Sequence, residues 1–440
     1  MPHKKQLYQA MGKSMVAKYT VYAVNLLSTI WLARLFTPEL FGTVAAIMVF
    51  FTFFQLISEV GLGPAVVNIN TLTPTDRNGI FGLTLLIGAG MSLLFYALSP
   101  VFTSFYNLPR VDEVVPYVAI SLFFSAAGIL PNAFLMRQQA FFHMAIAGLC
   151  SQVVATLAAV FLVQVIDPLH ALASRAVFGA VASFMAAYYF SAVTEFGRPV
   201  WGRKLSAIKP LLSFSMYQFG FNFINYFSRN LDNILVGKYL GASSLGVYEK
   251  AYQLMAYPLQ LLTHAFTPAI QPVLRQYAND VEKIEHIHRD FTFKLSLLGA
   301  AAGLAMFLLA ELIVKVALGP NWGGVVPLIQ VLAIAIPVQI VLSTSGSFFQ
   351  TMNRPDLLFI SGFLSAIVMV AAIIWGIVQR DMIAMAWALV AAFHFNFFQA
   401  YFVMYSRIFK VNLLKFFTRM IPAGAVISGM VWFAHASFVS

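Results

Sequence analysis

Long apolar runs recur along the whole chain and are separated only by short polar gaps. A helix needs about 20 apolar residues to cross the hydrocarbon core of a bilayer, and we count about thirteen runs of that length. They cover roughly residues 13–35, 41–66, 79–106, 114–136, 141–166, 169–193, 210–236, 244–272, 291–318, 325–351, 356–379, 382–405 and 417–437. The strands of a membrane barrel would instead be alternating segments of about ten residues. Because a helix satisfies its own backbone hydrogen bonds in lipid, the sequence predicts an all-α polytopic membrane protein.

The composition agrees with this prediction. Of the residues in the chain, 60% are hydrophobic and only 10% are charged, whereas roughly a quarter of the residues in a soluble domain are charged. The first apolar run is not followed by a small-residue cleavage site, so we expect it to stay in place as a helix. The single cysteine, Cys150, excludes an intramolecular disulfide.

The net charge of +11 is distributed unevenly along the chain. If the N-terminus is cytoplasmic, most basic residues fall in gaps on the cytoplasmic side, while the other side keeps mainly Arg110, Arg175, Lys238 and Arg380. This is the asymmetry that orients membrane proteins, and it explains the basic surplus without a nucleic-acid partner. We therefore expect a multi-pass protein with a cytoplasmic N-terminus.

One stretch of the chain occurs twice. ARLFTPELFG (33–42) returns as VGKYLGASSLG (236–246), which aligns Arg34 with Lys238 and ends on Gly42 or Gly246. The same spacing aligns Asn25 with Arg229, and with one gap QLISEVGLGPAV (55–66) aligns with QLLTHAFTPAI (260–270). Six predicted spans separate the copies, and because this number is even, both copies enter the membrane from the same side. The sequence therefore predicts a parallel repeat about an axis along the membrane normal.

The repeat divides the chain into predicted lobes. We expect an N-terminal lobe of six helices (1–193), a cytoplasmic linker (194–209), a C-terminal lobe of six helices (210–405) and an additional C-terminal helix (406–440). None of the polar gaps is long enough to hold an independent domain. Any activity should therefore lie within the membrane.

The sequence lacks the common motifs that bind nucleotides or metal ions. It contains no G-x-x-x-x-G-K-[ST] phosphate loop, no Asp-x-Asp pair for a metal–nucleotide-sugar site and no His/Cys cluster with metal-ligand spacing. We therefore predict no catalytic residue, no metal and no cofactor, and a protein that is not an enzyme.

Polar residues inside apolar spans are costly, and they usually face a bundle interior or a wet cavity. The seventh span has such residues at steps of three and four on one helical face: Asn222, Asn225, Tyr226, Arg229, Asp232 and Asn233. One interpretation is structural, with Arg229 paired to Asp232 and the amides bonded across helices. The alternative is that the stripe lines a cavity and contacts a solute.

Five further residues are candidates for the same cavity or for ion coupling. Lys18 and Asn25 form a thinner polar face on the first span, although Lys18 could instead extend to the membrane surface. Lys250, in YEKAYQ (248–253), either anchors the chain at the outer interface or faces the cavity. Glu59 and His264 occupy matching repeat positions beside Gly61, Pro64 and Pro268. They are candidates for proton coupling or, alternatively, polar residues at helix kinks.

At RLFTPELFG and at NLDNILVGKYLGASSLGVY (230–248) the chain resembles a known family. It is similar to the polysaccharide transporter family of the multidrug/oligosaccharidyl-lipid/polysaccharide exporter superfamily, the Wzx-type flippases. The resemblance covers nearly the whole chain, and the second motif is the more specific one. It implies two six-helix lobes around a central cavity. Many members have fourteen helices, one more than the thirteen counted here.

The resemblance also implies a function. Such proteins move undecaprenyl-diphosphate-linked oligosaccharides across the bacterial cytoplasmic (inner) membrane for exopolysaccharide or lipopolysaccharide biosynthesis. Membrane lipids surround them, and a polysaccharide polymerase and chain-length machinery are possible partners. The substrate-binding candidates are then Arg229, Asn222, Asn225, Asp232, Asn25, Lys18 and Lys250. The alternatives are a drug/cation antiporter of the same superfamily, whose cavity should favour carboxylates, and a membrane polysaccharide polymerase or glycosyltransferase.

Overall fold

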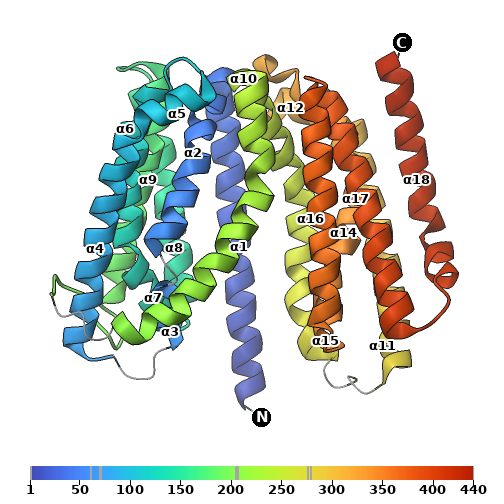
Figure 1. Ribbon diagram of the computed structural model, residues 1–440, viewed down its shortest axis with the longest axis horizontal. Coiled ribbons are helices and arrows are strands. Elements are labelled where there is room, and N and C mark those ends of the chain that lie inside the picture. The colour runs from blue at the N-terminus through green and yellow to red at the C-terminus, as the bar shows by residue number, and fades with distance from the viewer. Residues whose placement is uncertain are drawn as a thin grey trace. The chain divides into compact units, whose positions relative to one another are not determined.

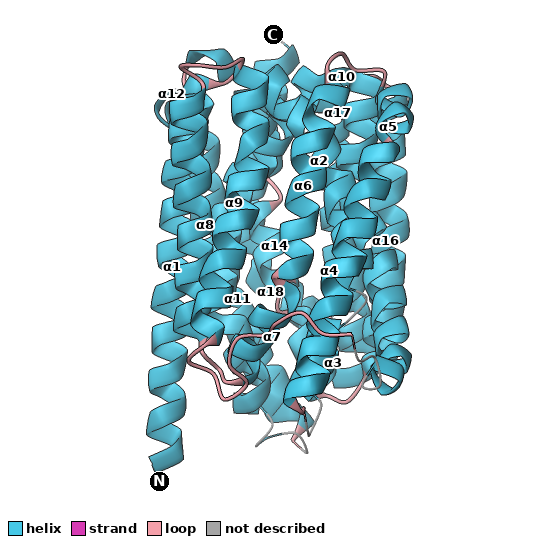
Figure 2. Cartoon of the chain, turned by 90° about the vertical axis from the view of Figure 1, so that its left-hand side faces the viewer, coloured by secondary structure: helices cyan, strands magenta, loops and turns pink. Residues whose placement is uncertain are grey.

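The computed structural model describes the backbone of residues 2–59, 62–68, 72–203, 208–274, 277 and 280–439. Among these residues all regular structure is helical, and no strand occurs (Figure 2). The prediction of an all-α polytopic membrane protein is confirmed. The described residues include nine helices that are long and apolar enough to cross a membrane, and a bent pair of helices could form a tenth span. The count of thirteen spans and the internal duplication stay predictions.

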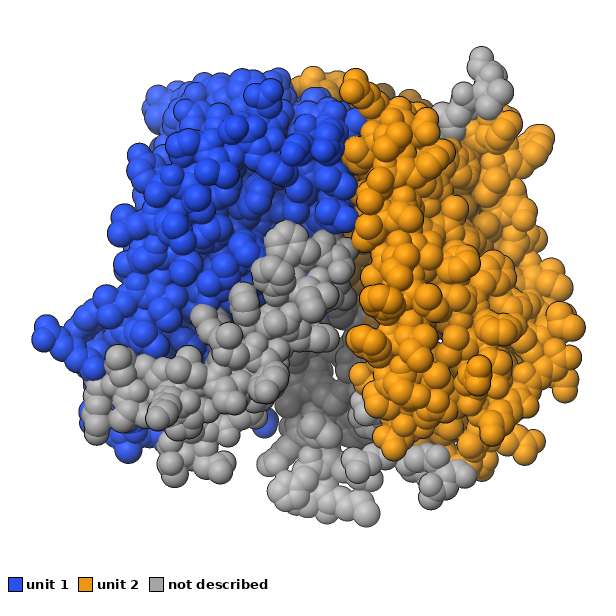
Figure 3. Space-filling view, in the orientation of Figure 1, with its two compact units in different colours: residues 1–246 blue, residues 247–440 orange. Residues whose placement is uncertain are grey.

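The chain forms two compact units, residues 1–246 and 247–440 (Figure 3). The first unit contains nine helices and the beginning of a tenth (Figure 1): α1 (Pro2–Leu35), α2 (Pro38–Glu59), α3 (Leu62–Asn68), α4 (Pro74–Ala97), α5 (Ser99–Tyr106), α6 (Val111–Ala127), α7 (Ile129–Arg137), α8 (Phe141–Leu162), α9 (Pro168–Ser191) and the first part of α10 (Ile208–Leu274). The predicted lobe boundaries follow the sequence repeat and stay a prediction.

Helices α4 and α9 of the first unit begin with the same kind of N-terminal cap. The Thr73 side chain accepts a hydrogen bond from the amide of Asp76 before α4, and the Asp167 side chain accepts one from the amide of Leu169 before α9. Each cap is followed by a proline at the first helical position, where the missing amide hydrogen is not needed. These pairs therefore fix where α4 and α9 begin.

The core of the first unit lies around α6, which packs against α2, α4 and α9. Its fully buried face consists of Val111, Val114, Val115, Val118 and Leu122, at the spacing of an α-helix. Phenylalanines of the neighbouring helices complete this core through close ring contacts: Phe54 with Phe95 (5.1 Å between centroids), Phe95 with Phe102 (4.9 Å) and Phe50 with Phe102 (4.8 Å). Such aromatic pairs are favourable beyond their buried area.

An ionic contact joins the α5–α6 loop to the α8–α9 loop. The Arg110 guanidinium donates hydrogen bonds to Glu113 (2.8 Å) and to Asp167 (2.7 Å). The bond from Arg110 lowers the pKa of Asp167 to about 2. A carboxylate whose folded-state pKa is depressed stabilises the fold above its unfolded pKa and loses this effect as the pH falls through the folded value. The contact is therefore fully formed at neutral pH.

The segment that follows α9 is held against the start of α4. The amide of Val200 donates to Asn78 Oδ1 (3.1 Å), and the Arg77 guanidinium donates to the carbonyl oxygen of Phe196. A Cβ placed on Gly82 would lie 2.0 Å from the carbonyl oxygen of Gly202, so the two backbones touch at this point. Residues 196–202 therefore follow the surface of the first unit.

The second unit contains the end of α10 and the remaining helices (Figure 1): α11 (Val281–Leu308), α12 (Ala310–Ala317), η2 (Pro320–Trp322), α13 (Val325–Ala333), α14 (Ile336–Leu342), α15 (Ser345–Thr351), α16 (Pro355–Val378), α17 (Met382–Met404), η3 (Tyr405–Phe409) and α18 (Leu414–Val439). The predicted span 325–351 is broken, with a bend of 54° between Val325–Ala333 and Ile336–Thr351. Helices α16 and α17 pack side by side, and Gly376 allows α16 to approach Met385 of α17 closely.

A buried histidine connects several helices of the second unit. His288 of α11 is completely buried, and its Nδ1 lies 3.1 Å from the hydroxyl of Tyr405, the first residue of the π-helix η3. The rings of Phe348 and Phe416 lie 4.6 and 5.8 Å from the imidazole. This cluster attaches α18, which begins just after the π-helix, to the helices that precede it.

The close contact at Gly82 generates a testable prediction. In Gly82→Ala the new methyl group would collide with the backbone of Gly202, so we expect residues 196–203 to leave the surface of α4. Trypsin should then cleave after the exposed Arg203 severalfold faster in the detergent-solubilised protein. Gly90→Ala is the matched control, because a Cβ at Gly90 has open space around it. Equal cleavage rates in the two variants would contradict the contact.

Candidate functional site

The polar face of the first span is used in a contact between helices. Asn25 of α1 accepts a hydrogen bond through Oδ1 from Nε2 of Gln152 in α8, at 3.3 Å. Ser28 and Thr29, one turn further along α1, are buried. Asn25 is therefore partly committed to holding α1 against α8. The side chain of Lys18 lies outside the described residues.

Only part of the polar stripe on the seventh span is described. Tyr226 is buried and donates its hydroxyl to the carbonyl oxygen of Val49 in α2. Asn230 donates to the carbonyl oxygen of Tyr226 (3.0 Å), and Asp232 accepts from the amide of Asn233 (2.8 Å). The Tyr226 bond places this part of the stripe against α2, whereas the other two bonds lie within α10. The side chains of Asn222, Asn225 and Arg229 lie outside the described residues.

Lys250 lies in a buried polar row along α10. The ammonium group donates to Gln253 Oε1 (3.0 Å), and Gln253 Nε2 lies 3.5 Å from the hydroxyl of Tyr257. Only 5% of Lys250 is exposed, and Tyr248 is fully buried. The two interpretations of Lys250, an anchor at the outer interface or a group facing the cavity, both stay predictions, and Tyr248 and Lys250 are enclosed by protein. A buried ammonium within an apolar helix is a candidate group for binding an anion.

Glu59 is the last residue of α2, and α3 begins at Leu62. The carboxylate of Glu59 reaches toward α3, because Oε1 lies 3.0 Å from the position of a Cβ on Gly63. A half-buried carboxylate within a membrane protein can take part in proton or cation coupling. The side chain of His264, its predicted counterpart, lies outside the described residues.

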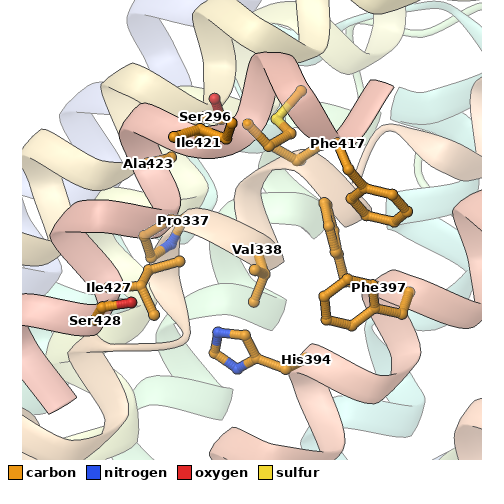
Figure 4. Close-up of a pocket in the computed structure, with 14 residues that line it drawn as sticks. Ser296, Pro337, Val338, His394, Phe397, Phe417, Ile421, Ala423, Ile427 and Ser428 are labelled. Atoms are coloured by element: carbon orange, nitrogen blue, oxygen red, sulfur yellow. The ribbon is translucent and has the colours of Figure 1, made fainter. Parts of the chain in front are cut away.

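The second unit contains an apolar cavity of about 360 Å³ (Figure 4). It is bounded by α11, α14, α17 and α18, and Phe397, Phe417, Val338 and Ile421 contribute much of its lining. His394 reaches its edge, but the Nδ1 of this ring already contacts the carbonyl oxygen of Val390 at 2.8 Å. A lining of this kind fits a hydrocarbon chain and offers few partners to a sugar or a phosphate.

Sequence reasoning missed several groups that complete these contacts. Gln152 was detectable, because it is one of only two amide side chains within the apolar run 141–166. Gln253 lies three residues after Lys250, and this helical spacing is also a readable signal. The carbonyl oxygen of Val49 has no sequence signal, since every residue carries a carbonyl and only the fold determines which one faces Tyr226.

Known proteins share the sequence pattern and the fold of this chain. The sequence profile of the polysaccharide biosynthesis protein family matches residues 31–327, more than half of the chain. The chain belongs to this family. The resemblance seen in the sequence motifs is thereby confirmed.

Curated relatives are distant but cover most of the chain. The teichuronic acid biosynthesis protein TuaB of Bacillus subtilis is 22% identical over 382 residues, which are 86% of this chain and 78% of that protein. The succinoglycan biosynthesis transport protein ExoT of Rhizobium meliloti is 21% identical over 384 residues, 87% of this chain and 77% of that protein. The similarity of this family member to both proteins therefore extends across both of its compact units.

Solved structures share the fold of this family member. The lipid II flippase MurJ, in an inward closed conformation, matches with a TM-score of 0.72 at 13% identity and covers 97% of this chain and 99% of its own. An inward-facing multidrug resistance MATE family transporter of the MOP superfamily matches with a TM-score of 0.66 at 14% identity, over 87% of this chain and 94% of its own. The fold is thus that of polytopic membrane transporters.

The contact between Asn25 and Gln152 gives a prediction for this family member. A double-mutant cycle of Asn25→Ala and Gln152→Ala, followed by thermal unfolding in detergent, should give a coupling energy of about 0.6 kcal/mol, the mean for such bonds in membrane proteins. Asn25→Asp keeps the acceptor and should retain most of the stability. Strictly additive effects of the two alanine substitutions would show that the bond contributes nothing.

Proposed function

We propose that this protein is a flippase that moves undecaprenyl-diphosphate-linked oligosaccharides across the bacterial cytoplasmic membrane for surface or exopolysaccharide biosynthesis. The observation that carries the proposal is the combination of family and fold. The chain belongs to a polysaccharide biosynthesis family, and its fold is shared, over nearly its whole length, by a flippase for a lipid-linked substrate. The relative ExoT is named as a transport protein, which agrees with a transport function for this chain.

The charge of the substrate explains why cations inside the membrane matter. A diphosphate-linked sugar is anionic and very polar, so its path needs cations for the phosphates and amides for the sugar. We assign the binding of the phosphates to Arg229, together with Lys18 and Lys250. We assign the binding of the sugar to Asn222, Asn225 and Asn25. Asp232, three residues after Arg229, belongs to the same proposed site. The burial of Lys250 supports this assignment, because an ammonium removed from water gains most from an anionic ligand.

We further propose that two lobes alternate in opening to the two sides of the membrane. The chain contains no ATP-binding motif, so transport would depend on an ion gradient or on the supply and removal of substrate. Glu59 and His264 are the proposed coupling groups. On the outer side, a polysaccharide polymerase and chain-length machinery would receive the product.

A drug/cation antiporter is the second candidate, because a MATE transporter shares the fold. A site for cationic drugs should be lined by carboxylates, whereas the polar residues within the spans of this chain are mostly amides and cations. Resistance to cationic dyes that depends on this gene, with unchanged polysaccharide, would favour the antiporter.

The proposed orientation places the N-terminus in the cytoplasm, so the α5–α6 loop is outside and the segment after α9 is inside. Asp112, at the start of α6 next to this loop, and Glu195, after α9, are exposed carboxylates. In a Cys150→Ser background, a cysteine replacing Asp112 should react with an impermeant thiol reagent in intact cells. A cysteine replacing Glu195 should react only in inverted vesicles. The opposite pattern would reverse the topology.

The role of Arg229 is tested by export. If Arg229 binds the diphosphate, Arg229→Ala and the double variant Arg229→Met/Asp232→Leu should both abolish surface polysaccharide. Arg229→Lys should keep partial export, because the charge survives without the bidentate geometry of a guanidinium. The measurement is polysaccharide export in a deletion strain complemented at matched membrane abundance. If the residue only pairs with Asp232, the double neutral variant should be tolerated, as buried ion pairs often are, and full export by that variant would refute phosphate binding.

A further inference from the structure

Residues 196–203 form a non-helical segment, here called the strap, which follows α9 and runs along the beginning of α4. At its start, the ring of Phe196 stacks on Phe134 of α7, with 5.0 Å between the centroids. At its end, a Cβ placed on Gly202 would lie 2.5 Å from the backbone of Asn78, and a Cβ placed on Gly82 would lie 2.0 Å from the carbonyl oxygen of Gly202. The first unit therefore holds the strap at both ends.

The strap lies at the depth of the membrane boundary. Gly82 comes eight residues after Pro74, the first residue of α4, which corresponds to about 12 Å along a helix. Helix α4 has 24 residues and is therefore about 36 Å long, whereas the hydrocarbon core of a bilayer is about 30 Å thick. Only about 6 Å of α4 exceeds the core, so the contact at Gly82 brings residues 200–202 to the level of the lipid headgroups and the adjoining hydrocarbon.

The exposed side of the strap combines apolar and cationic groups. Val200 and Trp201 are each 51% exposed, although both are large hydrophobic residues. Arg198, whose guanidinium lies 5.3 Å from the centre of the Tyr189 ring, and Arg203 are exposed on either side of this pair. Within the part of the chain that the structure describes, neither of these two arginines forms an ion pair. The strap thus presents an apolar pair flanked by two cations.

The charge around the strap is mainly positive. Beneath it, Arg77 donates a hydrogen bond to the carbonyl oxygen of Phe196, and the Arg137 guanidinium lies 4.6 Å from the centre of the Phe196 ring. These two arginines add to the exposed pair on the strap. The carboxylates of the described residues next to this surface are Asp76 and Glu195. The surface is therefore complementary to an anionic ligand.

We infer that the strap binds anionic phospholipids, with Trp201 in the interface and Arg198 and Arg203 on the phosphate groups. The proposed cytoplasmic N-terminus places the strap at the cytoplasmic leaflet, whose anionic lipids give it a negative surface potential. Tryptophan is enriched at membrane interfaces, and an arginine can bind a phosphate through two parallel hydrogen bonds. An acidic protein would match the charges, but only a lipid also matches the depth of Trp201. The bound lipid holds the connection between α9 and α10 against the first unit.

The binding is measured by fluorescence quenching in nanodiscs. Trp201→Phe keeps an aromatic ring, so the emission lost in this variant is that of Trp201 and not of the other five tryptophans. The nanodiscs contain about 30% phosphatidylglycerol in phosphatidylcholine, and bromine is carried either by the phosphatidylglycerol or by an equal amount of the phosphatidylcholine. We expect brominated phosphatidylglycerol to quench Trp201 about fivefold more strongly, since one cation near the membrane surface favours an anionic lipid by roughly this factor.

Matched charge variants separate a site on the strap from a general attraction of the basic protein. Arg198→Gln/Arg203→Gln should make the two brominated lipids quench equally. Arg407→Gln/Lys415→Gln removes the same charge from exposed residues of the second unit and should leave the preference unchanged. Equal quenching by the two lipids in the unaltered protein would overturn the inference. Trp201 emission that aqueous acrylamide quenches and neither lipid quenches would also overturn it, and would leave the strap to a protein partner.

A second variant leaves every residue of the strap in place. Gly82→Ala should detach the strap from α4, so quenching of Trp201 by both brominated lipids should fall severalfold, whereas the control Gly90→Ala should not change it. Unchanged quenching in Gly82→Ala would overturn the placement of Trp201 by α4. None of these measurements uses transport. If deletion of the gene leaves polysaccharide export unchanged, the proposed function fails, whereas the quenching still decides whether the strap binds anionic lipid.

Discussion

A peptide group inside hydrocarbon has no water to replace a missing hydrogen bond, and the rest of this structure depends on that constraint. It leaves helices as the form of the described spans, and it confines irregular backbone to short bends such as the one between α13 and α14. Backbone segments can then approach one another closely only where side chains are absent. Gly82 against Gly202, Gly376 against Met385 and Gly42 against Ala242 are such places.

The same constraint governs the polar side chains. In the second unit Lys250 meets Gln253, and His288 meets Tyr405. In the first unit Asn25 meets Gln152, and Tyr226 meets the backbone of Val49. Each of these bonds replaces water that the membrane excludes, so each polar residue is kept at a definite depth. A residue held in this way is preorganised, which is the property that a site for a charged, sugar-bearing lipid requires.

Much of the fold was predictable because its signals are local. Apolar run lengths identify the spans, and the pairs Thr73–Pro74 and Asp167–Pro168 mark where α4 and α9 begin. The partners of polar residues were less predictable, since Gln152 is far from Asn25 in sequence and a backbone carbonyl carries no signal. His288 shows the same limit, because its aromatic surroundings come from α15, α17, η3 and α18. Gly42 and Gly246 were visible as aligned glycines in the sequence, but the close approach of their backbones to Ala242 and Pro38 was not.

A transporter must keep some contacts while it moves, and the core of the first unit contains contacts that are costly to break. Around α6 a phenylalanine core and the ion pairs of Arg110 hold α2, α4 and α9 and the loops between helices, and separating these elements would expose apolar rings and leave charges unpaired. Where α2 meets α10, glycines at positions 42 and 246 let the two backbones touch without a side chain between them. The Tyr226 hydroxyl joins the same two helices through the carbonyl oxygen of Val49, so separating them would leave a buried hydroxyl without its acceptor. The contact of α2 with α10 thus combines close backbone packing with a buried hydrogen bond.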